Sequence, residues 1–277
     1  MDNIFLEQKL KKFLLEDIGI KDITTDNLDI DRKVKGYFVA KDNGILAGIE
    51  FAIKIFKILD KDLEIISFKP DGSKIEKGEI ILEILGSGKA LLKGERTALN
   101  IVQRLSGIAT LTNKYVRQLE GTKTKLLDTR KTTPSFRYFE KYAVKVGGGH
   151  NHRFALYDMV MIKDNHIKFV GSIKEAVRQI KSKVSPMVKI EVEVSNIDEL
   201  MEALDTEVDI IMLDNMTLEE MEKAVKIVNG KVKLEASGNI TLDNIKDVAL
   251  TGVDYISTGA TIHSSKWLDI SMRIDII

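Results

Sequence analysis

The sequence contains no cysteine among its 277 residues. This absence excludes disulfide bonds, catalysis by a thiolate and zinc sites built from cysteine, and it is compatible with a reducing compartment. The chain also lacks net charge, with 42 basic and 42 acidic residues, and it has no long basic tract. Binding to nucleic acid through phosphate contacts is therefore not expected.

Long apolar runs are missing as well, since none approaches the roughly 20 residues that a membrane-spanning helix needs. The first residues are acidic and are soon followed by further charges, so they do not resemble a secretory signal. With 44% hydrophobic and 30% charged residues, the composition is that of a soluble globular protein with one large barrel or two domains. We expect a cytoplasmic location and no membrane partner.

The first 110 residues combine helices with neighbouring strands instead of alternating the two strictly. Apolar residues at helical spacing predict a helix over 3–17, and a second helix is expected over 51–59. Short β-rich runs predict strands at 34–40, 63–68 and 79–85. We expect an N-terminal domain of mixed α and β structure over 1–110, followed by a long helix over 91–119.

From Lys125 onward, a strand, a polar strand end and a helix recur in that order. Strands are expected at 125–127, 159–162, 188–194, 209–213, 232–234 and 254–256, with helices between most of them at 173–180, 197–204, 218–228 and 242–250. This alternation predicts a parallel sheet in a second domain over 111–277, of which about the last 12 residues are expected to return to the first domain. Because about six units are present instead of eight, we expect an incomplete or open α/β barrel.

Polar or flexible residues follow one expected strand after another. They are residues 128–131, 163–165, 214–215, 235–238 and 257–259. In parallel α/β barrels, the carboxyl ends of the strands form the face where active sites assemble. Thr217 is placed to cap the helix that follows Asp214, which leaves Asp214 available for another role.

The run Lys189–Val194 alternates charged and apolar residues. Because successive side chains of a strand point to opposite faces, Glu191 and Glu193 share one face. In a barrel, the apolar face would pack on the helices and leave both glutamates inside, where each needs a cationic partner such as Lys189 or a metal. An edge strand with solvated glutamates is the alternative.

The segment 128–167 concentrates cationic side chains on a chain without net charge. It holds three of the four histidines together with Arg130, Lys131, Arg153 and Lys163. Cations at strand ends and beside glycines predict a pocket for a small, strongly anionic substrate that carries carboxylates, phosphates or both.

Several residues have a structural interpretation as well as a functional one. The run Gly147–Gly149 could end a helix over 140–146, or it could let a ligand approach the backbone closely. His152 fits both roles equally well, whereas His150 and His166 are expected to be structural. Gly238 and Gly259 follow late strands, where barrels often hold a phosphate on backbone amides.

Longer motifs resemble those of the quinolinate phosphoribosyltransferase family, also called carboxylating nicotinate-nucleotide pyrophosphorylases. They include Asp-Thr-Arg-Lys-Thr at 128–132 and Gly-Gly-Gly-His-Asn-His-Arg at 147–153. The likeness continues at 94–100, 105–110, 141–144, 162–166, 191–194, 213–215, 235–238, 252–254 and 259–260, so it covers essentially the whole chain.

This resemblance implies a fold and a reaction. Such enzymes have an N-terminal α/β sandwich followed by an incomplete α/β barrel. They join quinolinate to 5-phosphoribosyl 1-diphosphate, release diphosphate and carbon dioxide, and form nicotinate mononucleotide for NAD synthesis.

The same resemblance implies roles for individual residues. The two carboxylates of quinolinate would be held by Arg130, Lys131, His152 and Arg153, with Thr129 in the same substrate-binding set. Arg96 would enter from a neighbouring subunit, so that a homodimer is the smallest complete unit. The catalytic residues would be Lys163, which contacts the phosphoribosyl substrate, and Glu193 and Asp214, which contact its ribose and Mg²⁺. The phosphates would be held by Ser237, Gly238, Asn239, Thr258, Gly259 and Ala260.

Three positions depart from the family pattern. Asn239 and Ser135 stand where many members have glycine, and Lys21 replaces a frequent glycine. Asn tolerates a positive φ better than most residues, so we expect phosphate binding to be retained. None of the three changes removes a charge that the chemistry needs.

Alternative functions are open at this point. The related protein of molybdate-transport operons shares the Thr-Arg-Lys-Thr and Gly-Gly-Gly segments, but the intact run Lys163–His166 favours the quinolinate enzyme. A phosphosugar aldolase or isomerase would use Lys163 as a Schiff-base nucleophile. A catalytically silent sensor of phosphate ligands would not need the carboxylate pair and Lys163 together.

Overall fold

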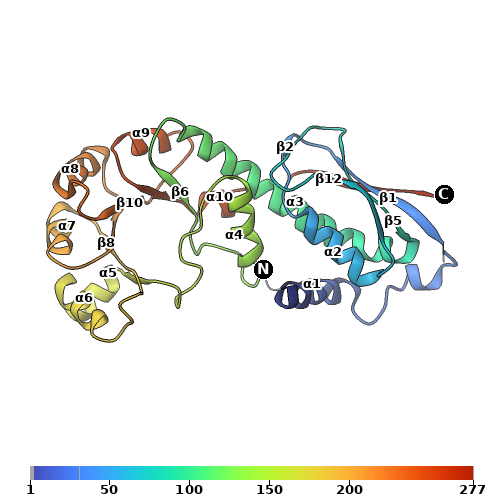
Figure 1. Cartoon of the computed structure of the whole chain (residues 1–277), viewed down its shortest axis with the longest axis horizontal. Coiled ribbons are helices and arrows are strands. Elements are labelled where there is room, and N and C mark those ends of the chain that lie inside the picture. Colours follow the sequence, from blue (N-terminus) through green and yellow to red (C-terminus); the bar gives the residue numbers. More distant parts are fainter. Residues whose placement is uncertain (1–2, 31, 277) are drawn as a thin grey trace. The chain divides into compact units, whose positions relative to one another are not determined.

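The computed structural model describes residues 3–30 and 32–276, and Figure 1 shows how the elements of each part are arranged. The chain divides into two compact units. One comprises Met1–Leu111 together with Ser265–Ile277, and the other comprises Thr112–Ser264. The boundary falls within the long helix α3 (Gly88–Gln118). This helix confirms the one expected over 91–119.

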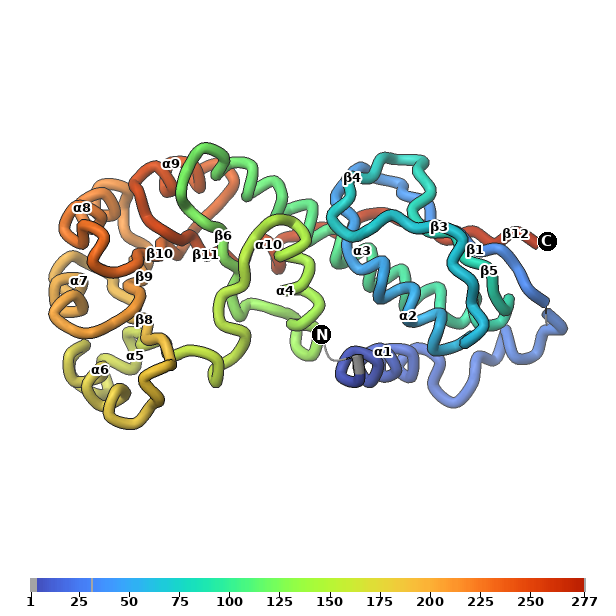
Figure 2. The backbone as a smooth tube through the Cα atoms, in the orientation of Figure 1, coloured from blue at the N-terminus to red at the C-terminus, as the bar shows by residue number. Residues whose placement is uncertain are grey.

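An antiparallel sheet is the framework of the first unit. Its strand order is β12-β1-β5-β3, where β1 is Lys33–Ala40, β3 is Glu64–Phe68, β5 is Ile80–Ser87 and β12 is Ile270–Ile276. Figure 2 shows β12 running along β1, with which it pairs antiparallel. The strands expected at 34–40, 63–68 and 79–85 are confirmed. Strand β12 was not predicted from the sequence, although Ile270 and Ile274 alternate with polar residues, a pattern typical of a strand.

The first unit also contains helices. They are α1 (Asn3–Ile18), α2 (Ile49–Leu59) and the first part of α3, and a 3₁₀ turn (Thr25–Asn27) and the short strands β2 (Gly44–Ile45) and β4 (Lys74–Ile75) complete the described part of the unit. The fully buried rings of Phe38 on β1 and Phe56 on α2 meet edge to face, with centroids 6.0 Å apart. Gly36 of β1 lets α3 approach, because a Cβ there would lie 2.6 Å from Leu91 Cδ2. The unit is therefore the α/β sandwich that the resemblance implies.

The second unit is built on six parallel strands. They are β6 (Lys125–Leu127), β7 (Val160–Ile162), β8 (Ile190–Val194), β9 (Ile210–Asp214), β10 (Lys233–Ser237) and β11 (Tyr255–Ser257). Their order is β6-β11-β10-β9-β8-β7, so β6 and β7 are edges and do not pair with each other. This arrangement confirms the prediction of an open α/β barrel.

Helices connect the strands and lie outside them, as Figure 1 shows for α6 to α9. They are α4 (Arg137–Val146), α5 (Asp164–Val170), α6 (Ile173–Lys181), α7 (Ile197–Leu204), α8 (Leu218–Val228), α9 (Ile245–Leu250) and α10 (Ala260–His263). The prediction missed α5 and α10, and α5 buries none of its residues, so no apolar face marks it in the sequence. Thr217 caps α8 as expected, with its side chain accepting a hydrogen bond from the Glu220 amide.

The alternating pattern of β8 is confirmed. Ile190, Val192 and Val194 are buried, and β8 lies between β7 and β9, so the alternative of an edge strand is wrong. Parallel pairing sets Val194 beside Leu213 and Ser237 beside Asp214, which brings the carboxyl ends of these strands to one edge of the sheet. Among the described residues, none of the helices combines the length and the apolar character needed to cross a lipid bilayer.

Candidate active site

A pocket of about 590 Å³ opens at the carboxyl ends of the strands in the second unit. Its lining consists of Thr129, Arg130, Lys131, His152, Arg153, Met161, Lys163, Glu193, Met212, Asp214, Asn215, Ser237, Gly238, Asn239 and Ser257. Most of these are the polar residues that follow the strands in the sequence. The parallel sheet therefore brings together side chains that are far apart along the chain.

Four residues of the expected site are absent from the described lining. Thr258, Gly259 and Ala260 lie directly after Ser257 at the start of α10, and a Cβ on Gly259 would lie 2.9 Å from Lys131 Cδ. Arg96 is an exposed residue of α3 and belongs to the first unit.

Met161, Met212, Asn215 and Ser257 line the pocket without having been proposed as site residues. Asn215 and Ser257 are marked only by their position at a strand end.

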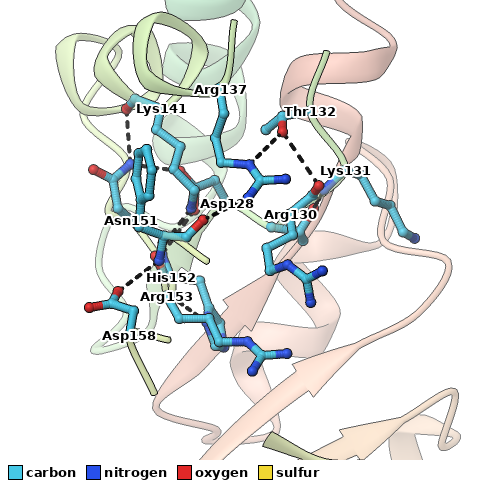
Figure 3. A network of polar contacts seen from close by, with 12 residues as sticks. Asp128, Arg130, Lys131, Thr132, Arg137, Lys141, Asn151, His152, Arg153 and Asp158 are labelled. Atoms are coloured by element: carbon cyan, nitrogen blue, oxygen red, sulfur yellow. Dashed lines mark hydrogen bonds and ion pairs between the residues drawn. The ribbon is translucent and has the colours of Figure 1, made fainter. Parts of the chain in front are cut away.

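Two guanidinium groups define the cationic side of the pocket. Figure 3 shows the Arg130 and Arg153 side chains extending to the same side of a polar network. Arg153 Nη1 donates a hydrogen bond to the Met159 carbonyl at 3.0 Å, which fixes the direction of its guanidinium. Partial burial, followed by the positive charge of Arg130, lowers the pKa of Arg153, whereas Glu191 opposes this shift. The two cations are therefore close enough to repel each other, and an anion between them would relieve that repulsion.

A buried ion pair supports the segment on which Arg153 lies (Figure 3). Lys141 Nζ pairs with Asp128, and the two side chains are 3% and 0% exposed. Asp128 also accepts hydrogen bonds from Asn151 Nδ2 at 2.6 Å and from the His152 amide at 2.9 Å. Burial raises the pKa of Asp128 and lowers that of Lys141, so the pair depends on these additional hydrogen bonds to stay charged. No role for either residue was predicted from the sequence.

Carboxylates line the same pocket. Glu193 at the end of β8 pairs with Lys163, which follows β7, and the two side chains are 15% and 41% exposed. Lys189 or a metal was expected as the partner of the glutamates of β8; Lys189 is wrong, because Lys163 pairs with Glu193 and His152 with Glu191. Asp214 ends β9 and accepts a hydrogen bond from Asn215 Nδ2 at 2.9 Å.

The turn after β10 has an unusual backbone. Gly238 and Asn239 have φ angles of 95° and 51°, so the asparagine does occupy the left-handed region that it tolerates. A Cβ on Gly238 would lie 2.2 Å from Asn215 Oδ1, so a larger residue cannot fit there. Asn239 Nδ2 donates to the same Asn215 oxygen at 3.0 Å. The turn thus presents exposed polar groups at the pocket wall, as an anion-binding loop requires.

The glycine run 147–149 has a structural role. Gly147 caps α4, and a Cβ on Gly149 would lie 2.8 Å from Val144 Cγ1. None of the three glycines is among the described residues that line the pocket, and the role of the run in ligand approach stays a prediction. His166 is structural, as expected, since its Nδ1 accepts a hydrogen bond from the Lys163 amide at 2.9 Å.

His152 lies in a buried cluster with two glutamates. Its Nε2 is 3.0 Å from Glu191 Oε2 and 3.5 Å from Glu235 Oε2, and both glutamates are 0% exposed. Burial alone would lower the pKa of His152, but the contact with Glu191 and the charges of both glutamates outweigh burial and raise it. Burial, and then the charge of Glu191, raises the pKa of Glu235 to about 8.

Comparison with known proteins gives matches over both units. The profile of the quinolinate phosphoribosyl transferase C-terminal domain matches residues 108–273, and that of the N-terminal domain matches residues 22–106. A probable carboxylating nicotinate-nucleotide pyrophosphorylase of Bacillus subtilis is 46% identical over 274 residues, which is 99% of this chain and 95% of the relative. Its counterpart in Synechocystis is 44% identical over 274 residues, covering 98% and 93% of the two chains.

Solved structures agree with this result. The nicotinate-nucleotide pyrophosphorylase of Francisella tularensis superposes on the chain with a TM-score of 0.93 and 42% identity, covering 99% of this chain and 98% of that one.

Proposed function

The chain belongs to the quinolinate phosphoribosyltransferase family, and on this premise we propose that it makes nicotinate mononucleotide for NAD biosynthesis. The reaction transfers the phosphoribosyl group of 5-phosphoribosyl 1-diphosphate to quinolinate, with release of diphosphate and carbon dioxide. The observation that supports this most directly is that two guanidinium groups, on Arg130 and Arg153, and two carboxylates, on Glu193 and Asp214, line the same pocket. The guanidinium groups suit a diacid, and the carboxylates suit an electron-poor sugar.

Quinolinate is the ligand that suits the cationic side. It has two adjacent carboxylates, and planar guanidinium groups bind carboxylates through two parallel hydrogen bonds. Arg130 and Arg153 line the same pocket and interact electrostatically, so a diacid can contact both. Thr129 and Lys131 complete this part of the proposed binding set.

The carboxylate side suits the sugar and a metal. Loss of diphosphate builds positive charge near the anomeric carbon, and Glu193 and Asp214 can stabilise that charge in a partly buried site. Two carboxylates in one pocket also fit Mg²⁺, which usually binds proteins through one or two carboxylates and otherwise binds water and substrate phosphates. When bound, Mg²⁺ would offset the negative charge of the departing diphosphate. Lys163 would contribute to the same effect from the protein.

Decarboxylation follows from the substrate's own chemistry. Once the pyridine nitrogen is ribosylated it is cationic, and the adjacent positive charge stabilises the carbanion left when the neighbouring carboxylate departs as carbon dioxide. The protein then has to bind, orient and balance charge, and no side-chain nucleophile is required. Ser237, Gly238 and Asn239 at the pocket wall, with Thr258, Gly259 and Ala260 just beyond, are the groups proposed for the sugar phosphates.

The proposal includes the assembly and the location of the enzyme. Arg96 is an exposed guanidinium on α3, which is compatible with its entering the site of a second subunit in a homodimer. A cytoplasmic location belongs to the same proposal.

One assay tests the proposed reaction. Purified protein is mixed with Mg²⁺, quinolinate and 5-phosphoribosyl 1-diphosphate, and both carbon dioxide and nicotinate mononucleotide are measured. We expect both products in equal amounts, and little product when nicotinate replaces quinolinate, because nicotinate lacks the second carboxylate. Absence of nicotinate mononucleotide with quinolinate, or equal rates with the two acids, would refute the proposal.

A further inference from the structure

A series of hydrogen bonds between asparagine side chains ends at the Asp214 carboxylate. Asn215 Nδ2 donates to Asp214 Oδ2 at 2.9 Å, and Asn215 Oδ1 accepts from Asn239 Nδ2 at 3.0 Å. The Asn239 carbonyl accepts in turn from Asn244 Nδ2 at 2.9 Å. The series therefore runs from the N-terminal cap of α9 to the end of β9, and Asp214, Asn215 and Asn239 line the pocket.

The carboxylate sets the direction of these bonds. A carboxylate only accepts hydrogen bonds, so the Asn215 amide must turn its nitrogen to Asp214 and its oxygen to Asn239. Asn239 must then donate to Asn215, because its own oxygen would face another oxygen there. Asn244 is held in the same sense, since its Oδ1 accepts from the Thr241 amide at 2.8 Å. Reversing any one of these side-chain amides would therefore place two acceptors or two donors against each other.

The backbone is shaped to seat the Asn215 side chain against the turn after β10. Asn215 and Asn239 have φ angles of 54° and 51°, and Gly238 has a φ of 95°. A Cβ on Gly238 would lie 2.2 Å from Asn215 Oδ1, so glycine leaves the room that this amide occupies. The main-chain amide of Asn215 also donates to the Ser237 carbonyl at 2.9 Å. Left-handed backbone at residues other than glycine is unfavourable, and it persists where the surroundings fix it, often at functional sites.

We propose that Asn215 and Asn239 are positioning residues that fix the orientation of the Asp214 carboxylate in the pocket. Because the bond from Asn215 engages Oδ2, it also determines where Oδ1 lies. This inference rests on the proposed function for the role of Asp214, which is to stabilise the positive charge that develops on the sugar. Asn239 stands where many family members have glycine, so its link to Asn215 is a feature of the present chain.

Direct contact between the Asn239 side chain and a substrate phosphate is the competing explanation. In both cases, replacing Asn239 lowers activity, but only a positioning role requires Asn215. If Asn239 acts through Asn215, its replacement has little further effect once Asn215 is removed, whereas a direct contact is lost in either background. Phosphate binding by the main-chain amides is compatible with both explanations, because the hydrogen-bond series uses only the side chain and the carbonyl of Asn239.

The first experiment is a double-mutant cycle of Asn215→Ala and Asn239→Gly, followed by steady-state kinetics. Glycine adopts the left-handed backbone of residue 239 without strain. We expect each single change to lower kcat by about tenfold, because a displaced carboxylate stabilises the transition state less, and to leave the KM for quinolinate within about threefold. The double variant should stay within about threefold of Asn215→Ala. A loss of about a hundredfold in the double variant, or an unchanged kcat in either single variant, would overturn the proposal.

Asn229→Gly is the matched control for the glycine substitution. Asn229 is exposed, has a φ of 45° and forms the C-terminal cap of α8. Replacing this left-handed asparagine should leave both kcat and the KM for quinolinate unchanged. A loss of kcat equal to that of Asn239→Gly would mean that the effect does not come from the pocket.

The second experiment reverses the direction of the bonds. Asn239→Asp keeps the size of the side chain and tolerates the left-handed backbone, but a carboxylate cannot donate to Asn215 Oδ1. The Asn215 amide should then turn over and present its oxygen to Asp214. The new charge can also repel substrate phosphates, and this effect is common to all backgrounds. We therefore expect Asn239→Asp to reduce kcat by about tenfold more in wild type than in the Asn215→Ala variant. Equal reductions would contradict the proposal.

A third measurement does not depend on turnover. In the ¹⁵N-labelled wild type, the bonded side-chain amide proton of Asn215 should lie downfield of those of Asn229, and Asn239→Gly should reduce this displacement as the bond to Asp214 loosens. An Asn215 resonance that is identical in the two proteins, or that matches Asn229 in wild type, would refute the inference. If wild type makes no nicotinate mononucleotide, the proposed function fails, and these resonances still decide whether Asn215 and Asn239 hold Asp214.

Discussion

Lys163 and Glu193 form an ion pair inside the pocket, at the carboxyl ends of the neighbouring strands β7 and β8. Each side chain is thereby the other's counter-ion. A ligand that binds either of them has to compete with this pair. In the proposed reaction, diphosphate would compete at Lys163 and Mg²⁺ would compete at Glu193, so both would act on the same ion pair.

Lys163→Met should reduce kcat by about 10²–10³, because it removes a preorganised positive charge near the departing diphosphate. Lys189→Met is the matched control, since Lys189 is exposed and lies at the other end of β8. Steady-state kinetics with both substrates measure the effect. A kcat for Lys163→Met close to that of the control would show that Lys163 has no role in the chemistry.

Arg130→Lys and Arg153→Lys should each keep the fold and lower kcat/KM for quinolinate by about 10² or more. An ammonium keeps the charge but cannot form the two parallel hydrogen bonds of a guanidinium. Arg178→Lys serves as the control, because Arg178 pairs with Glu175 on the surface of α6. Near-normal quinolinate kinetics in both pocket variants would rule out the diacid clamp.

Breaking the buried pair of Asp128 and Lys141 should destabilise the protein strongly. Lys141→Met leaves Asp128 buried without its cation, and we expect the free energy of unfolding to fall by about 3–5 kcal/mol. The exposed pair of Lys168 and Asp164 provides the control, and Lys168→Met should change stability by less than about 1 kcal/mol. Urea unfolding followed by circular dichroism measures both values. Similar losses in the two variants would contradict this account of the network.

Stability should depend on pH through Glu235. Its pKa is raised from 4.5 to about 8 in the folded protein, so the folded state binds this proton more tightly than the unfolded state does. The resulting stabilisation is complete below the unfolded pKa and is lost as the pH rises through about 8. Glu235→Gln removes the titration, so wild type should lose stability relative to this variant between about pH 5.5 and about pH 8.

Urea unfolding at both pH values tests this prediction. Glu222→Gln, which changes an exposed glutamate of α8, should follow wild type. A stability difference between wild type and Glu235→Gln that does not vary with pH would show that Glu235 titrates normally.

Subunit mixing tests the proposed role of Arg96. Arg96→Ala and Lys163→Ala should each be nearly inactive alone. If Arg96 enters the partner's site, a mixed dimer of the two variants has one intact site, and random mixing should restore about a quarter of wild-type activity. Activity that stays at the level of the separate variants after subunit exchange would mean that Arg96 serves its own chain or has no role.

Local patterns in the sequence predicted much of this fold. The periods of β8 and of helices such as α7 and α8 follow from which side chains must be buried, and that requirement is visible in neighbouring residues. The polar strand ends were predictive for a similar reason, because parallel strands bring their carboxyl ends to one edge. Short elements were missed: α5 has no buried residue and therefore no apolar pattern.

The partners of the charged residues depended on the tertiary structure. The sequence indicated that Glu191 and Glu193 need cations, but it suggested Lys189, which is close only along the chain. The structure pairs them with His152 and Lys163 from other segments. It also showed that Gly147 caps α4 and that Gly149 packs tightly against Val144.

The sequence by itself therefore determined the family through its long motifs, and it predicted the open barrel and an anionic substrate from the periodicity and the types of its residues. Only the tertiary structure decided which side chains meet and which of them are buried. Both properties arise where distant segments pack together, and burial then sets hydrogen-bond partners and pKa values that no local pattern encodes.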